Sequence, residues 1–523
     1  MHLLQKGSVM NNLVIINGQI NTMNPLQPYA EAMLIEKGII VSIGLNEEIL
    51  RGMPFDAEVI DAKGNSIFPG FYDLHTHFMM TGQNLSAVPL NHVRSQKELI
   101  SVLKEKEKTI GSRAWLQGVG YDENQFVEKK LPDIEKLDVE FPHRPVFIER
   151  QDAHQCYMNT AAFHMLGLSM EMRGVETDEQ GRFSGILKDP AVGIARNLLA
   201  DELITPEMRE SYLFLAAEEA LKKGVTSVCA MEGGEICNEK DIPVFLNYQE
   251  KLPLHTILMH QTLDVDKVIS EGQNAIGGCI ILDGSIGSRT AAFFEDYADQ
   301  PGCKGELYYS QKDIEDFVME AHSKGLQIGM HCIGDKAIEQ LLSAYEKALE
   351  RFPRKNHRHR FEHFSVPTYE QILRTRQIGG YLSVQPSYIS TQAAINMYHA
   401  RLGEERLKRN CLMRTYLQMG IPLGGGSDAP VTPFDPFGGI AATMFHFHSG
   451  ERLSFYEGLS LFTRDAAGFV FEEKKRGTLE PGKVGDVVIV NRNVWRMNFN
   501  EKEEIQRIQV LYTIVSGEVQ YKK

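Results

Sequence analysis

The sequence contains little of what marks a membrane, secreted or nucleic-acid-binding protein. It has no apolar run long enough to cross a bilayer. Its first residues carry one lysine and a short apolar segment, which is not the pattern of a secretory signal, so we expect a cytoplasmic protein; Met10 is a second candidate start. The formal net charge of -14 disfavours nucleic acid or an anionic membrane as a partner.

Paired cysteines, low-complexity segments and short repeats are also missing. The seven cysteines are dispersed without paired spacing, which is typical of reduced thiols in a cytosolic enzyme and not of a disulfide scaffold. The composition, 43% hydrophobic and 24% charged over 523 residues, indicates a globular protein large enough for a catalytic domain and a smaller second domain.

Both ends of the chain are rich in β-type segments. Residues 12–66 contain short apolar runs separated by Asn-Gly and Lys-Gly turns, and residues 477–523 have the same character. We predict that residues 1–66 and 477–523 form one composite β-sandwich. The alternative is two separate hairpins that pack on the middle domain.

The middle of the chain, residues 67–476, alternates strand-like and helical segments. Helix signals separate most of the apolar runs: Thr205-Pro206 precedes a helix that Gly224 ends, and Ser310 precedes another. Eight strands that alternate with helices predict an α/β protein with a (β/α)8 TIM-like barrel. The strand-like runs are residues 67–77, 225–231, 254–260, 276–284, 326–332, 358–364, 379–385 and 421–428.

A long segment separates the first two of these runs. It contains a helix whose capping box extends from Ser95 to Glu98. Residues 85–205 are mixed in composition and patterned throughout, so we expect a folded insertion after the first strand. An insertion of this length in a barrel loop at the catalytic face is typical of a lid or a substrate pocket.

Metal-ligating side chains stand where the predicted strands end. His75 and His77 are one residue apart at the end of the first run, so both imidazoles can point to the same side of a strand. A lone pair of this kind is also consistent with two polar residues at a strand end. In a barrel, however, all strands end at one catalytic rim. The residues that we expect there are His75, His77, Cys279, Asp283, His331, His363 and Asp428.

The motifs that carry these residues resemble those of the amidohydrolase superfamily. They are FPGFYDLHTHF, MHCIGDKAI, RFEHF and GGGSDAPV, in this order. Three further stretches, ILDGSIGSRTA, QDAHQCYMNTAA and GTLEPGKVGDVVIV, are similar to the branch of N-substituted formamide deformylase and the exoenzyme regulatory proteins. The resemblance covers nearly the whole chain. It implies one or two divalent metal ions per chain, with zinc as the leading candidate.

The resemblance also implies a role for each of these residues. His75 and His77 would bind the buried metal, and His331 and His363 would hold the same ion or a second one. Asp428 would be a ligand and would carry a proton from the attacking water to the leaving amine. Asp428 and His363 are therefore the predicted catalytic residues.

One position departs from the pattern of the superfamily. Two-metal members carry a carbamylated lysine near the end of the fourth strand, and Cys279 stands at that place. Cys279 could bridge two ions as a thiolate, or it could be a small buried residue beside a single ion. Asp283 is a third candidate, because it would share a strand face with Cys279.

Several polar residues are candidates for substrate binding. Asp152, His154 and Asn159 match a D-x-H…N stretch of the branch and predict a pocket wall that faces the metal; the alternative is a capped loop whose polar groups serve each other. Tyr121 carries a similar but weaker indication.

Two further candidates belong to the barrel itself. Arg289 could hold an anionic or carbonyl part of the ligand, or form a surface ion pair, and Gln385 ends the seventh strand. We expect His357 and His359 at the opposite end of the barrel, away from the chemistry.

These observations support three hypotheses about function. The first is a metal-dependent hydrolase that cleaves a C–N bond in a small amide, formamide or cyclic imide. The second is a deaminase of amino-heterocycles with the same site. The third is a regulatory or binding protein that has lost turnover, a hypothesis suggested by the missing lysine. We expect a small-molecule substrate in each enzymatic case, and a homodimer is the default oligomer.

Overall fold

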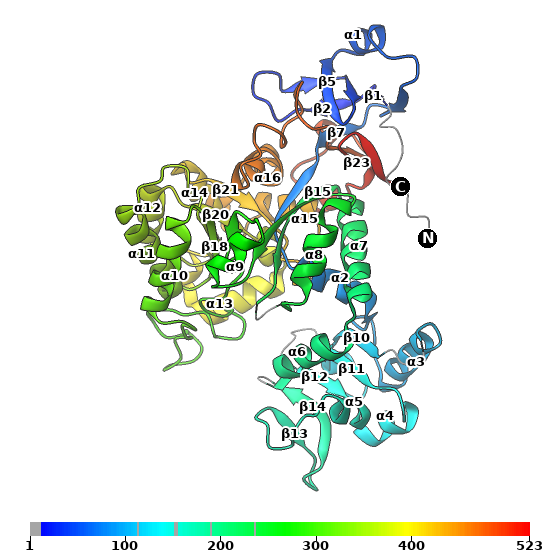
Figure 1. Cartoon of the computed structure of the whole chain (residues 1–523), viewed down its shortest axis with the longest axis vertical. Helices are drawn as coiled ribbons and strands as arrows, with labels where there is room; N and C mark the ends of the chain where they lie inside the picture. Colours follow the sequence, from blue (N-terminus) through cyan, green and yellow to red (C-terminus); the bar gives the residue numbers. More distant parts are fainter. Residues whose placement is uncertain (1–11, 112–114, 151–154, 189–190, 235–236) are drawn as a thin grey trace. The chain divides into compact units, whose positions relative to one another are not determined.

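The computed structural model describes residues 12–111, 115–150, 155–188, 191–234 and 237–523 (Figure 1). The chain divides into two compact units. The first comprises Met1–Phe78, Ala217–Ile242 and Leu246–Lys523, and the second comprises Met79–Ala216 and Pro243–Phe245. Within these described ranges, no helix has both the length and the apolar character needed to cross a membrane.

The first unit contains an eight-stranded parallel sheet. β15 is buried along its whole length, as expected of a strand in a parallel sheet that is covered on both faces. In spatial order the strands are β21 (Leu423–Gly425), β20 (Tyr381–Val384), β19 (Arg360–His363), β18 (Gln327–Cys332), β17 (Ala275–Ile276), β16 (His255–His260), β15 (Val225–Glu232) and β8 (Phe71–Thr76).

The two edge strands of this sheet approach each other and nearly close a barrel. The amide of Asp428 donates to the carbonyl of His75 at 2.7 Å, and the amide of His77 donates to that of Ala429 at 2.8 Å. Gly426 permits this approach, because a Cβ atom there would lie 2.7 Å from the His75 nitrogen. The predicted α/β class with a TIM-like barrel is therefore confirmed.

Helices pack around the barrel where the capping signals place them. Ser310 accepts a hydrogen bond from the Asp313 amide at the start of α10 (Gln311–Ser323). This helix packs against α11 (Asp335–Arg351), and both contact β18 (Figure 1). The other helices of the chain are α1 (Asn46–Arg51), α2 (Phe78–Ser86), α7 (Pro206–Lys222), α8 (Asp241–Tyr248), α9 (Val265–Ser270), α12 (Tyr369–Ile378), α13 (Gln392–Leu407), α14 (Met413–Gln418), α15 (Pro436–Met444), α16 (Phe455–Leu461), α17 (Arg464–Phe469) and α18 (Lys502–Gln506), besides those of the insertion.

The fourth barrel strand is much shorter than we predicted. We expected residues 276–284 to be extended, but β17 ends at Ile276. Gly277 and Gly278 follow with φ angles of +97° and +55°, a conformation that turns the chain out of the strand. Cys279 therefore lies on an irregular segment, which forms an isolated β-bridge with β18 at the pair Ile281 and His331.

The N-terminal and C-terminal segments share a sheet in the same unit. β7 (Ser66–Pro69) pairs with β22 (Val487–Val490) in antiparallel fashion, with Phe68 opposite Val488. The six-stranded sheet has the order β24 (Glu518–Lys522), β23 (Val510–Val515), β22, β7, β2 (Gln19–Asn21) and β3 (Tyr29–Ala30). A four-stranded sheet, β5 (Ile39–Gly44), β4 (Ala32–Glu36), β1 (Leu13–Ile16) and β6 (Glu58–Asp61), contributes to the same hydrophobic core.

The second unit contains the expected inserted range 85–205. It has its own apolar core and a mixed six-stranded sheet. The strands in order are β13 (Val175–Thr177), β14 (Phe183–Lys188), β12 (Gln155–Met158), β11 (Val146–Arg150), β10 (Leu116–Tyr121) and β9 (Val88–Pro89). Its helices are α3 (Gln96–Glu107), α4 (Ile134–Glu140), α5 (Thr160–Met165) and α6 (Ala191–Leu203).

Candidate metal centre

Six side chains meet at the carboxyl ends of the barrel strands. They come from five places in the chain: the end of β8 and the residue beyond it, the irregular segment after β17, the ends of β18 and β19, and the turn after β21. All six are buried, with relative exposures of 7% or less. They are His75, His77, Cys279, His331, His363 and Asp428.

These side chains form three overlapping groups whose ligand atoms lie within 4.8 Å of one another. The groups are His75, His77 and Cys279; Cys279, His331 and His363; and His75, His363 and Asp428. The Cys279 sulfur lies 3.9 Å from His331 Nδ1 and 4.0 Å from His363 Nε2. Cys279 belongs to two of the groups, so its thiol stands between the two pairs of imidazoles.

Each of the four imidazoles is held through one ring nitrogen and turns the other towards this centre. His75 Nδ1 lies 2.8 Å from Glu362 Oε2, and His363 Nδ1 lies 2.6 Å from Gln385 Oε1. His77 Nδ1 lies 3.6 Å from the sulfur of Cys237. Such partners fix the tautomer and the ring orientation of a metal-binding histidine.

His331 has the opposite orientation. Its Nε2 lies 3.3 Å from the carbonyl of Gly284 and 3.3 Å from Asp283 Oδ1, so that Nδ1 faces Cys279. Although burial acts in the opposite direction, Asp283 and Cys279 raise the pKa of His331 to about 10.

Glu362 and Arg360 form a buried ion pair behind His75 that our sequence analysis did not identify. Both side chains are fully buried, and Arg360 Nε lies 2.7 Å from Glu362 Oε1. Burial opposes the charge of Glu362, but Arg360 and His75 together lower its pKa. The motif RFEHF contained the signal, since alternate residues of a strand share a face.

Asp428 lies against two imidazoles and a phenol. Its Oδ1 is 3.2 Å from His77 Nε2 and 3.4 Å from His75 Nε2, and its Oδ2 accepts a hydrogen bond from Tyr388. Asp428 has a φ of +57°, an uncommon conformation that cores tolerate mainly at functional positions. Tyr388, which follows Gln385 by one turn, was not predicted from the sequence.

The donor set fits a divalent cation. His75 Nε2 and Asp428 Oδ1 are buried and have no hydrogen-bond partner among the described residues, although buried polar atoms are normally paired. Burial opposes charge at Cys279, but the imidazoles of His75, His331 and His363 lower the pKa of its thiol. A thiolate, neutral imidazoles and a carboxylate are the ligands that zinc and similar ions prefer.

Asp283 does not join these groups. Its Oδ1 accepts a hydrogen bond from the Ile333 amide at 3.0 Å, and its Oδ2 accepts from Ala292 and Gly334 at 2.8 Å each. The expectation that Asp283 shares a strand face with Cys279 was wrong, because the chain between them is not a strand.

The polar groups of the predicted substrate-binding residues that the structure describes form hydrogen bonds or ion pairs with nearby protein groups. Asn159 accepts from the Val146 and Ala162 amides at 3.0 Å and caps α5, as in the capped-loop alternative. Tyr121 accepts from the Gln155 amide group. Arg289 forms an ion pair with Asp299 at 2.9 Å, and Gln385 contacts His363. Asp152 and His154 lie outside the described residues.

An eight-stranded barrel with imidazoles, a thiol and a carboxylate gathered at its carboxyl rim is the architecture of a metal-dependent enzyme. A family model described as "Amidohydrolase family" matches residues 58–521, so the chain belongs to the amidohydrolase family. This confirms the predicted superfamily.

The full-length relatives agree with this assignment. The protein YtcJ of Bacillus subtilis (strain 168), whose name assigns it provisionally to the amidohydrolases, is 28% identical over 97% of this chain and 98% of its own length. N-substituted formamide deformylase of Arthrobacter pascens is 24% identical over 98% of this chain and 99% of its own.

A solved structure, an uncharacterized metal-dependent hydrolase from Pyrococcus furiosus, superposes with a TM-score of 0.79 at 29% identity. It covers 92% of this chain and 99% of its own. Family and neighbours together support a hydrolase that depends on a divalent metal.

Proposed function

We propose that the protein hydrolyses a C–N bond in a small amide, formamide or cyclic imide. The observation that carries the proposal is the overlap of three ligand groups, two of which share Cys279, with His75 Nε2 and Asp428 Oδ1 buried without a hydrogen bond to any described residue. The likeness over nearly full length to a protein named N-substituted formamide deformylase supports the class of bond.

Zinc is the proposed metal, and the groups accommodate two ions. His75, His77 and Cys279 would hold one ion, with Asp428 beside it, and Cys279, His331 and His363 would hold the second. Cys279 would then bridge the ions as a thiolate, in place of the lysine that this chain lacks. Bound metal supplies two effects: it lowers the pKa of a coordinated water and polarises the substrate carbonyl.

Side chains of the protein carry out the proton transfer. The burial of Asp428 would by itself raise the pKa of its carboxyl, but His75 and His77 lower it well below the ordinary value, so the group is an anion before the reaction. As a base, Asp428 takes a proton from the attacking water; as an acid, it returns that proton to the leaving nitrogen. Tyr388 donates to the other oxygen of Asp428 and holds the carboxylate in place.

Metal analysis combined with a substrate screen tests the proposal. Purified protein should contain up to two zinc equivalents per chain, and zinc-loaded protein should release amine from at least one member of a panel of N-formyl amines, N-acetyl amines and cyclic imides. Asp428→Asn protein provides the blank for contaminating hydrolases. A protein that binds no divalent metal, or that when loaded hydrolyses no member of the panel, contradicts the proposal.

A further inference from the structure

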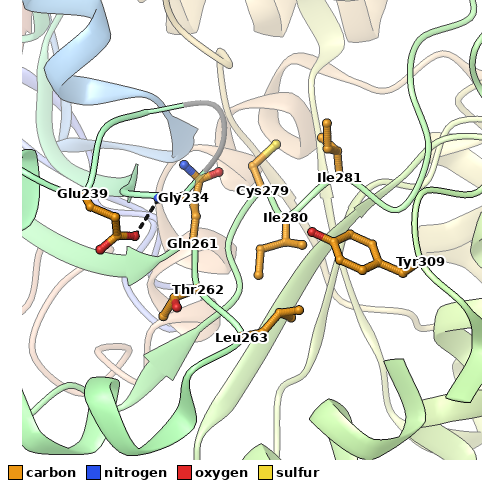
Figure 2. A pocket seen from close by; sticks show the side chains of 9 residues that line it. All are labelled: Gly234, Glu239, Gln261, Thr262, Leu263, Cys279, Ile280, Ile281 and Tyr309. Atoms are coloured by element: carbon orange, nitrogen blue, oxygen red, sulfur yellow. Dashed lines mark hydrogen bonds between the residues drawn. The ribbon is translucent and has the colours of Figure 1, made fainter. Parts of the chain in front are cut away.

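A pocket of about 260 Å³ adjoins the candidate metal centre at Cys279 (Figure 2). It is formed at the carboxyl ends of β15, β16 and β17, all within the first unit, and its walls include Gln261, Leu263, Ile280 and Ile281. Cys279 belongs both to this wall and to two of the ligand groups. A molecule in the pocket therefore lies next to the proposed reacting centre.

Gln261 presents an unused hydrogen-bond acceptor in this pocket. Its Nε2 donates to the carbonyls of Gly233 at 3.0 Å and Met231 at 3.2 Å, which identifies the nitrogen end of the amide. The oxygen end, Oε1, is buried and has no partner in the part of the chain that the structure describes. The side chain is 3% exposed, and Figure 2 shows its oxygen turned to the side of Cys279.

Apart from the hydroxyls of Thr262 and Tyr309, the rest of the pocket wall is apolar or carries a charge that has a partner. Leu263, Ile280 and Ile281 supply hydrocarbon surface. The one carboxylate in the wall, Glu239, lies 2.5 Å from Lys267 Nζ and accepts from the Gly234 amide at 2.9 Å. Burial opposes its charge, but these contacts lower its pKa, so the pocket does not require a cationic ligand.

We propose that this pocket selects secondary amides with one compact apolar substituent, whose N–H donates to Gln261 Oε1. This inference rests on the proposed function and narrows its substrate class. The volume is below the roughly 300–1,000 Å³ of pockets for drug-sized ligands, which favours a group of the size of benzyl or isobutyl. A buried acceptor left unpaired is costly, so a site of this kind rejects an analogue that lacks the donor.

A matched pair of ligands tests the proposal by binding, without relying on turnover. N-benzylacetamide carries one N–H, and N-benzyl-N-methylacetamide carries none. In isothermal titration of zinc-loaded wild-type protein we expect the first to bind at least about tenfold more tightly. In Gln261→Leu protein the preference should fall to within about twofold, with the N-methyl compound bound as in wild type.

A second variant separates loss of recognition from loss of folding. Gln261→Leu leaves the Met231 and Gly233 carbonyls without their donor, so its thermal unfolding is measured alongside. Leu263→Trp keeps every hydrogen bond of Gln261 and fills the apolar part of the pocket. Leu263 is 37% exposed, so the loop should tolerate the larger ring. Both ligands should bind at least about tenfold more weakly to this variant.

The proposed role of the pocket is wrong if wild-type protein binds the two compounds equally tightly or binds neither of them. It is also wrong if the preference persists in Gln261→Leu, or if Leu263→Trp binds both compounds as wild type does. The proposed function fails separately. If the expected binding preferences are found but no amide is hydrolysed, the pocket stands without the hydrolase; turnover without a Gln261-dependent preference leaves the hydrolase and removes the pocket.

Discussion

The barrel carries three His-x-His pairs, and two of them, His75 with His77 and His357 with His359, differ mainly in their surroundings. His75 and His77 lie at the end of β8, whereas His357 and His359 precede β19 at the opposite end of the barrel. All four are buried, with exposures of 4% or less. Residue type, spacing and burial therefore do not separate a candidate metal ligand from a structural histidine.

The pair before β19 has a partner for every ring nitrogen. His359 Nδ1 accepts from the Ile328 amide at 3.1 Å, and its Nε2 lies 2.8 Å from His322 Nδ1. His357 Nδ1 accepts from the His359 amide at 2.9 Å, and its Nε2 donates to the Ile378 carbonyl at 2.7 Å. Burial lowers the pKa of both imidazoles, with help from neighbouring positive groups.

The pair at the end of β8 shows the opposite pattern. His75 has one nitrogen held by Glu362 and the other without a hydrogen bond in the described part of the chain, and both histidines face the thiol of Cys279 and the carboxylate of Asp428. Burial opposes their protonation, but Cys279 and Asp428 raise the pKa of His75 well above the ordinary value, and Cys237 and Asp428 do the same for His77. Positive charge is stabilised here, and a bound cation can supply it in place of protons.

The largest expected effect comes from mutating one histidine in each of these two pairs and comparing the variants. His75→Ala should abolish hydrolysis and remove bound zinc, because the site loses a ligand. The control His357→Ala removes an imidazole of equal burial and should keep its zinc and its activity, with a loss of stability of about 1–3 kcal/mol. Zinc content and amine release measure the contrast; a His357→Ala protein that is also free of metal would refute it.

Asp428→Asn should lower kcat by about 10²–10⁴-fold, the usual contribution of a general acid–base group. The amide cannot accept the proton, but it keeps an oxygen near the metal, so most of the zinc should remain. Steady-state kinetics and metal analysis on the same preparation test this. Undiminished kcat would remove Asp428 from its role as proton carrier.

Cys279→Ala tests whether one residue joins the two ligand groups. If the thiolate bridges, the variant should retain at most one zinc equivalent where wild type holds two, since sulfur is a strong zinc ligand. Cys332→Ala is the matched control, because Cys332 is buried on β18 and belongs to none of the groups. Equal metal content in wild type and Cys279→Ala would make Cys279 a packing residue.

Glu362→Gln should weaken metal binding by about 10–100-fold without removing a ligand. The amide no longer fixes the Nδ1–H tautomer of His75 as a carboxylate does. The control Glu339→Gln weakens a partly exposed ion pair with Arg374 that lies outside the ligand groups, and it should leave zinc affinity unchanged. Competition with a zinc chelator measures both variants; equal affinities would show that Glu362 does not position His75.

The sequence predicted the barrel and its rim because both follow from periodicity. Apolar runs that end on His75, His331, His363 and Asp428 indicate strands, and the barrel topology brings their ends together. The shape of the segment after β17 was not predictable in this way, because two glycines end the strand before Cys279. The roles of Arg360, Tyr388 and Gln261 were not predictable either, because only the three-dimensional structure shows which polar groups contact the site or lack a hydrogen-bond partner.

The smallest expected effect concerns stability in acid at the base of the barrel. His322 Nδ1 accepts from His359 and its Nε2 donates to the Phe352 carbonyl, an arrangement that requires a neutral ring. Burial, followed by the positive charge of Arg354, lowers the pKa of His322 below 6.5. The unfolded chain therefore binds a proton that the folded chain resists, so this contribution to stability is complete above pH 6.5 and is lost as the pH falls below it.

His322→Gln should reduce this acid sensitivity, because an amide oxygen and an amide NH₂ can replace both hydrogen bonds without titrating. The free energy of unfolding in urea, measured at pH 7 and pH 5, should fall less in the variant than in wild type. An equal fall in both would mean that the chain of histidines tolerates a proton. The histidines at the base of the barrel would then accommodate positive charge, as those at the rim do. Hydrogen bonding within the cluster would no longer distinguish a structural histidine cluster from a metal-binding one.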